Sequence, residues 1–164
     1  MKKKRKKPKA KRLKAKRPKM KKPRTVKKVR AVIFDIKNQK PYFLILHRIL
    51  RWKGWEFLKE TMERGEKPID ALKRGIFEET KLKKFKIIGK LKEQEKWVYQ
   101  NNNYWIVETF LVWADMRQKI SLKQEIVEHD RYLWVTKEEA VEKLTWPKTK
   151  KLIQKLKING KPSK

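Results

Sequence analysis

The chain has 164 residues, of which 49 are Lys or Arg and 18 are Asp or Glu, so its formal net charge is +31. This charge favours polyanionic partners such as nucleic acid, and because no run of 18 apolar residues occurs, we expect no membrane partner. The sequence has no cysteine, which rules out disulfide-linked partners and thiolate metal sites. The length suits one domain with a tail.

The first 30 residues differ from the rest because they contain 19 Lys or Arg and no acidic residue. They hold too few apolar residues to pack, and three prolines would interrupt a helix, so the sequence predicts a disordered, RNA-binding tail over residues 1–24. No apolar segment of a secretory signal follows the basic start, and a nuclear address is the alternative interpretation. The cations expected to contact phosphates are Lys2, Lys3, Lys4, Arg5, Lys6, Lys7, Lys9, Lys11, Arg12, Lys14, Lys16, Arg17, Lys19, Lys21, Lys22 and Arg24.

A domain is predicted over residues 25–158, followed by a short C-terminal tail over 159–164. Residues 26–36 have the composition of a β-strand, and residues 42–47 are almost all apolar, which is typical of a strand buried on both faces. A helix is predicted from Pro68, because a first-turn position tolerates the missing amide of proline. Apolar residues at helical spacing follow it.

The second half of the domain alternates strands with helices. Thr136 and Glu139 have the spacing of a capping box, so a helix is expected to begin there. Pro147 is expected to begin a last helix, which Gly160 ends. Further strands are predicted over 85–91, 97–99, 104–113 and 132–135. This order of elements predicts an α/β fold in which a mixed β-sheet is sandwiched between helices.

Three glutamates flank the helix that begins at Pro68. Glu66 lies in the turn before it, and Glu78 and Glu79 lie near its end. Carboxylate oxygens are the ligands that Mg²⁺ prefers, and Mg²⁺ also binds substrate phosphates. Glu78 and Glu79 are therefore the candidate metal ligands, provided that the site is retained.

This stretch resembles the Nudix box, G-x5-E-x7-R-E-U-x-E-E-x-G-U, in which U is a bulky apolar residue. Three positions depart from the pattern: Glu60 and Lys81 stand where the family has glycine, and Gly75 replaces a family glutamate. The spacing is kept throughout. The matching residues are Glu66, Arg74, Ile76, Glu78, Glu79 and Leu82.

The departure at Gly75 bears most directly on activity. Positions 75, 78 and 79 share one helix face, so the family places three carboxylates on that face and this chain places two there. We therefore expect the box to be vestigial and to retain no catalytic residue. A glutamate placed at position 75 is expected to point at the same cation as Glu78 and Glu79.

The resemblance covers about residues 28–158 and is closest to the Nudix branch that hydrolyses diadenosine tetraphosphate asymmetrically. The runs that carry it are residues 43–48, 55–59, 104–105, 128–134 and 138–140. It implies the α/β/α Nudix fold. In active members of the family, Mg²⁺ and a cluster of glutamates activate water against a phosphoanhydride.

The same resemblance assigns candidate nucleotide-binding residues. Lys59 matches a lysine of that branch, and Tyr104 and Tyr132 stand where aromatic rings could stack on adenine, with core packing as the alternative role. His129 is expected to have a structural role or to orient a neighbouring group by a hydrogen bond, rather than to bind a metal ion. Glu125 and Glu128 could supply a further carboxylate from a loop, although a solvated loop position is favoured for Glu125.

The main hypothesis is a catalytically degenerate Nudix-fold protein that binds RNA and requires no cofactor. It would be ribosomal or ribosome-associated and would contact ribosomal RNA through its basic tail. Its expected location is cytoplasmic, with nucleolar or organellar locations as alternatives. The alternative function is an active Mg²⁺-dependent hydrolase of diadenosine tetraphosphate or another nucleoside polyphosphate, with a basic targeting tail. Decapping of mRNA is a third possibility and needs the same missing carboxylate.

Overall fold

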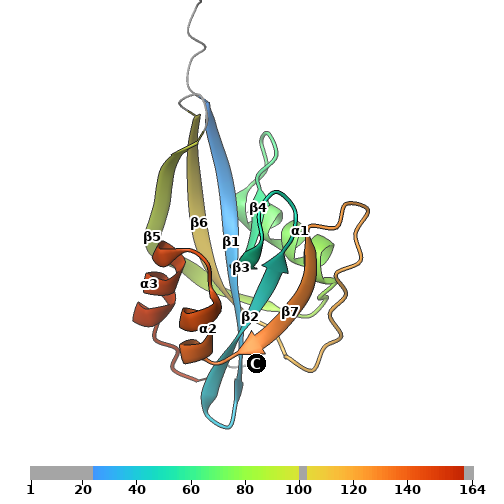
Figure 1. Cartoon of the computed structure of the whole chain (residues 1–164), viewed down its shortest axis with the longest axis vertical. Coiled ribbons are helices and arrows are strands. Elements are labelled where there is room, and N and C mark those ends of the chain that lie inside the picture. Colours follow the sequence, from blue (N-terminus) through green and yellow to red (C-terminus); the bar gives the residue numbers. More distant parts are fainter. Residues whose placement is uncertain (1–23, 100–102, 161–164) are drawn as a thin grey trace, which may run out of the picture.

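The computed structural model describes residues 24–99 and 103–160 (Figure 1). Within these residues, seven strands form one mixed sheet in the order β3-β2-β1-β6-β5, with β4 paired to β1 and β7 paired to β2. The strands are β1 (Thr25–Lys37), β2 (Lys40–Arg48), β3 (Gly54–Glu56), β4 (Leu58–Thr61), β5 (Lys86–Tyr99), β6 (Asn103–Trp113) and β7 (His129–Val135). The helices are α1 (Pro68–Thr80), α2 (Lys137–Lys143) and α3 (Pro147–Lys155).

Strand β1 is the centre of the sheet. It runs parallel to β6 and antiparallel to β2 and β4. Its buried side chains alternate between the two faces: Ala31 and Ile33 pack in a core with α1, whereas Val32 and Phe34 pack in a second core with α2 and α3. The predicted α/β architecture, a mixed sheet between helices, is therefore confirmed (Figure 1).

Helix α1 begins at Pro68, as the sequence predicts, and its buried face includes Leu72 and Ile76. It ends at Thr80, and the next residue, Lys81, caps it in a left-handed conformation with φ of 57°, its amide donating a hydrogen bond to the carbonyl of Phe77 at 2.9 Å. Glycine adopts this conformation most readily. The glycine of the family pattern at this position therefore has a conformational reason, and lysine occupies it at a cost of about 1–2 kcal/mol.

The local signals in the second half of the domain are confirmed in part. The capping box of Thr136 and Glu139 is present, and α3 begins at Pro147. Helix α3 ends at Lys155 and does not reach Gly160, because Leu156 is extended and packs back against the core formed with α2 and α3. The two strands predicted over 85–99 form one strand, β5, interrupted by register shifts.

The basic tail lies outside this description. Of its cations only Arg24 is described, and the backbone amide of Arg24 donates a hydrogen bond to Oδ1 of Asn103 at 3.0 Å. Most of the C-terminal segment over 159–164 also lies outside the described residues. In the part of the chain that is described, no helix is long and apolar enough to cross a membrane.

We predict that Leu72→Ala lowers the free energy of unfolding by about 2–5 kcal/mol, because it leaves a cavity between α1 and the sheet. Leu72 is fully buried, whereas Ile69 on the same helix is 37% exposed. Ile69→Ala is therefore the matched control and should lower the free energy of unfolding by less than about 1 kcal/mol. Urea unfolding followed by circular dichroism measures both, and equal losses would contradict the packing of α1 described above.

Candidate active site

A cleft with a volume of about 1260 Å³ opens beside the C-terminal end of α1. Its walls come from strands β1, β2, β4, β5 and β6, from the loops that precede β3 and β7, and from the start of α3. Lysine, arginine and tryptophan side chains share this concave surface with a set of carboxylates. The glutamates that line it are Glu60, Glu78, Glu79, Glu95, Glu125 and Glu128.

Glu79 is the buried carboxylate of this cleft. It is 5% exposed, and its Oε2 has no hydrogen-bond partner among the described residues, although Nδ1 of His129 lies 3.3 Å away. Burial, together with the negative charges of Glu60 and Glu56, raises the pKa of Glu79 well above its usual value. A buried carboxylate without a partner is unfavourable, so a cation in the cleft would be stabilised at this position.

Glu56 has the opposite environment, although it is also buried. Its carboxylate contacts Nζ of Lys59 at 2.7 Å, Nη1 of Arg48 at 3.1 Å and Nε2 of His129 at 3.4 Å. Burial by itself would raise the pKa of Glu56, but the hydrogen bond with His129 and the charges of Lys59 and Arg48 lower it to about 2. His129 therefore lies between an ionised glutamate and Glu79, which agrees with the expected orienting role.

Arg74 joins the loop before α1 to the helix. Its guanidinium donates two hydrogen bonds to Glu66, each at 2.9 Å, and one to the carbonyl of Thr61 at 2.9 Å. The hydrogen bond from Arg74 lowers the pKa of Glu66 to about 2. Neither Arg74 nor Glu66 lines the cleft. These two box residues therefore anchor the loop to α1 and lie outside the cleft lining.

Nη1 of Arg74 also reaches the carboxylates at the edge of the cleft. It lies 3.3 Å from Oε2 of Glu78 and 3.4 Å from Oε1 of Glu60. With these two side chains held by Arg74, no group of three or more His, Cys, Asp or Glu within the described ranges is arranged to hold a metal ion. The residue types nevertheless suit Mg²⁺, because it prefers carboxylate oxygens and other glutamates line the same cleft as Glu79, whose Oε2 has no hydrogen-bond partner among the described residues.

Gly75 and Glu60 occupy adjoining positions on α1 and β4. An ideal Cβ built on Gly75 would lie 2.6 Å from Cβ and 3.0 Å from Cγ of Glu60. The helix face itself carries two carboxylates, as the sequence indicates, and Glu60 brings a third carboxylate from the neighbouring strand close to the position of the missing Cβ. A single substitution to glutamate at position 75 would place its Cβ too close to Glu60, so Glu60 would have to shift, and the expectation that such a glutamate points at the same cation stays a prediction.

Four tryptophans in two pairs line the cleft, and the sequence did not single them out. The ring centroids of Trp97 and Trp105 are 5.7 Å apart, and those of Trp52 and Trp146 are 5.2 Å apart. Nζ of Lys28 lies 4.3 Å from the centroid of the Trp105 ring. The available signals were the number of tryptophans, seven in 164 residues, and the place of Trp105 in one of the runs that carry the family resemblance.

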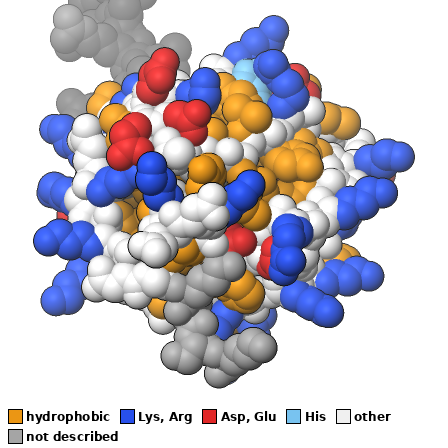
Figure 2. Space-filling model, turned by 90° about the horizontal axis from the view of Figure 1, so that it is seen from below, with side chains coloured by type: hydrophobic (Ala, Val, Ile, Leu, Met, Phe, Trp, Pro, Cys, Tyr) orange, Lys and Arg blue, Asp and Glu red, His pale blue; other side chains and the backbone are white. Residues whose placement is uncertain are grey.

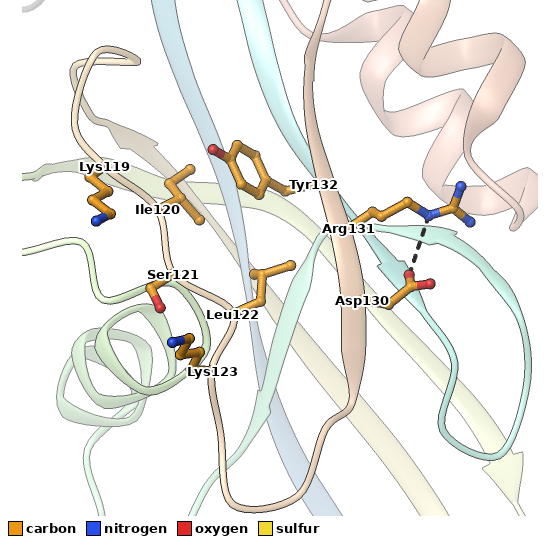
Figure 3. Close-up of a pocket in the computed structure, with 8 residues that line it drawn as sticks. All are labelled: Lys119, Ile120, Ser121, Leu122, Lys123, Asp130, Arg131 and Tyr132. Carbon is orange, nitrogen blue, oxygen red and sulfur yellow. Dashed lines mark ion pairs between the residues drawn. The ribbon is translucent and has the colours of Figure 1, made fainter.

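The structure places the candidate nucleotide-binding residues in different environments. Lys59 lines the cleft and pairs with Glu56. Tyr104 and Tyr132 are not among the residues that line it. Tyr132 lies beside Ile120 in a separate, shallow pocket of about 560 Å³ between β7 and the preceding loop (Figure 3). The structure therefore does not bring the two tyrosines to the glutamates, and their role stays a prediction.

Comparison with known proteins shows the family. The model of the NUDIX domain matches residues 24–156. No curated protein matches the chain.

Solved structures resemble the chain at low sequence identity. An Ap4A hydrolase from C. elegans, solved as a binary complex, is 21% identical with a TM-score of 0.67, over 79% of this chain and 93% of that chain. A NUDIX hydrolase assigned in Listeria monocytogenes is 22% identical with a TM-score of 0.64, over 77% and 88%. A MutT protein from Methanosarcina mazei is 18% identical with a TM-score of 0.63, over 81% and 93%. These solved structures share the fold of this chain. Because the match to the NUDIX domain model spans most of the length of this chain, the chain belongs to the NUDIX domain family.

Proposed function

We propose that the protein is a Mg²⁺-dependent hydrolase of nucleoside polyphosphates, with dinucleoside polyphosphates such as diadenosine tetraphosphate as the preferred class. The observation that carries the proposal is the buried, unpartnered oxygen of Glu79 in a cleft lined by further carboxylates, cations and tryptophans. The structural similarity to an Ap4A hydrolase supports the same class of reaction.

The cations of the cleft are suited to a chain of phosphates. Lys28, Lys81 and Lys148 line it together with Arg48 and Lys59, whose charges are already partly neutralised by Glu56. Ammonium and guanidinium groups bind phosphate oxygens through charge-assisted hydrogen bonds. A polyphosphate is therefore favoured over a neutral ligand of the same size.

The tryptophans are suited to bases at both ends of such a substrate. One pair comes from β5 and β6, and the other comes from the loop before β3 and the residue preceding α3. Stacking of a base on an aromatic side chain contributes about 1–3 kcal/mol. Two separate pairs favour a substrate with two bases over a mononucleotide.

The carboxylates at the end of α1 are the groups that would hold the metal, with Glu79 at the centre and Glu78 beside it. Bound Mg²⁺ supplies the positive charge that stabilises the phosphoryl transition state and activates water. His129 sits against Glu79 and is itself fixed by Glu56. Arg48 bridges Glu56 to Glu128 at 3.1 and 3.0 Å, which ties the loop before β7 to the same group.

The ribosomal, catalytically degenerate interpretation has no support in the comparisons. Its main argument was the carboxylate missing at Gly75, and that argument is weakened because Glu60 occupies the adjoining space. The expectation that the protein requires no cofactor depended on the same argument.

We predict that the protein hydrolyses diadenosine tetraphosphate in the presence of Mg²⁺ and that EDTA abolishes the reaction. Glu79→Gln should lower kcat/KM roughly 100-fold or more, because losing the central metal ligand removes several kcal/mol of transition-state stabilisation. Glu63→Gln changes an exposed glutamate that does not line the cleft and should leave the rate unchanged.

Products are separated by ion-exchange chromatography, and circular dichroism verifies that each variant is folded. A wild-type protein that hydrolyses neither diadenosine tetraphosphate nor ATP with Mg²⁺ or Mn²⁺ would contradict the proposed function.

A second proposal concerns the basic tail over residues 1–24 and rests on its 16 Lys or Arg. We propose that this region binds RNA through phosphate contacts. Lysine and arginine side chains also project around the domain face seen in Figure 2, with hydrophobic side chains between them, so the domain adds to the positive charge.

If about 8 of these cations contact phosphates, the logarithm of RNA affinity should fall against the logarithm of salt concentration with a slope of roughly −6 to −7. A variant without residues 1–23 should show a much flatter slope in fluorescence anisotropy titrations. The same slope for both proteins would refute a role of the tail in RNA binding.

A further inference from the structure

The two departures from the box pattern at positions 60 and 75 are reciprocal. The pattern has glycine at the first position and glutamate at the second, whereas this chain has Glu60 and Gly75. The positions are 15 residues apart in the sequence, yet they adjoin in the structure because β4 and α1 pack together. The exchange therefore concerns one place in the fold.

The space between these two positions accommodates one side chain. A Cβ on residue 75 would lie 2.6 Å from Cβ of Glu60, which is closer than two non-bonded carbon atoms approach. Glu60 therefore requires glycine at position 75. By the same geometry, a glutamate at position 75 requires glycine at position 60, as in the family pattern.

The Glu60 side chain reaches the region where a residue-75 side chain would begin. Its Oε1 accepts a hydrogen bond from the Thr61 amide at 2.7 Å and lies 3.4 Å from Nη1 of Arg74. Its Oε2 lies 3.5 Å from the position of the missing Cβ. Glu60 also lines the same cleft as Glu78 and Glu79.

An independent feature of the cleft points to a cation. Oε2 of Glu79 is buried without a hydrogen-bond partner in the described part of the chain, and the cleft reaches this side chain. Glu60 and Glu78, both held by Arg74, are on adjoining elements. A divalent cation beside Glu79 would compete with Arg74 for these two carboxylates, and its higher charge favours the exchange.

We propose that Glu60 is a metal-binding residue that supplies, from strand β4, the carboxylate that the family pattern supplies from helix position 75. Glu60, Glu78 and Glu79 together then hold one divalent cation in the cleft. The inference rests on the proposed function in one respect only: it takes the bound cation to be the one used in hydrolysis. The competing explanation is that Glu60 serves solely as an ion-pair partner of Arg74.

Calorimetric titration of the full-length protein with Mn²⁺, without nucleotide, distinguishes the two explanations. We expect Glu60→Gln to weaken Mn²⁺ binding about tenfold or more, as even the loss of outer-shell partners weakens metal sites 10- to 100-fold. Glu63→Gln should bind as the wild type does. The double variant Glu60→Gly/Gly75→Glu returns the carboxylate to the helix and should bind within about threefold of the wild type.

Equal Mn²⁺ affinity of Glu60→Gln and the wild type would overturn the inference, and so would a folded double variant that binds as weakly as Glu60→Gln. Thermal unfolding supplies a readout that does not depend on metal. Gly75→Ala should lower Tm in the wild-type background, although alanine normally stabilises a helix interior, and should not lower it in the Glu60→Gly background. Equal effects in both backgrounds would also overturn the inference.

The hydrolysis assay separates this inference from the proposed function. A protein whose Mn²⁺ affinity depends on Glu60 but which hydrolyses no nucleoside polyphosphate supports the inference and contradicts the proposed function. An active enzyme whose Mn²⁺ affinity is unaffected by Glu60→Gln contradicts the inference alone.

Discussion

The contact between β4 and α1 has room for one side chain, and the candidate site depends on that constraint. Because Gly75 has no Cβ, Glu60 extends past the helix and reaches the edge of the cleft. Glycine in a helix interior costs roughly 0.5–1 kcal/mol relative to alanine, and the buried residues Leu72 and Ile76 on the same helix offset this cost through packing. The helix therefore keeps its position although its sequence departs from the family pattern.

Most of the glutamates around the cleft are paired with arginine or lysine side chains. Arg74 neutralises Glu66 and also reaches Glu60 and Glu78, while Arg48 and Lys59 neutralise Glu56. Glu79 is buried, its Oε2 accepts no hydrogen bond from the described residues although Nδ1 of His129 lies 3.3 Å away, and burial raises its pKa. A buried carboxylate of this kind is tolerated when it is protonated or when a ligand supplies the missing positive charge. The division of charge thus distinguishes Glu79 from its neighbours and supports its place at the centre of the proposed metal site.

The sequence predicted what depends on local spacing. Pro68, Pro147 and the capping box of Thr136 each act within one turn of helix, so their positions could be inferred without a structure. The short strands β3 and β4 were missed because three or four residues carry too little periodicity to identify a strand. The contact between Glu60 and Gly75 could not be predicted for a related reason: it is tertiary, and the two residues are 15 positions apart in the sequence.

The central claim is that the carboxylate has moved from the helix to the strand while the metal site has been kept. Diffraction from crystals of the wild-type protein soaked in Mn²⁺, measured with anomalous scattering, tests it most directly. The account predicts an anomalous peak in the cleft with oxygens of Glu60 and Glu79 at the bonding distance of a small divalent cation, about 2.0–2.2 Å. A peak that is coordinated without Glu60, which stays paired with Arg74, would contradict it.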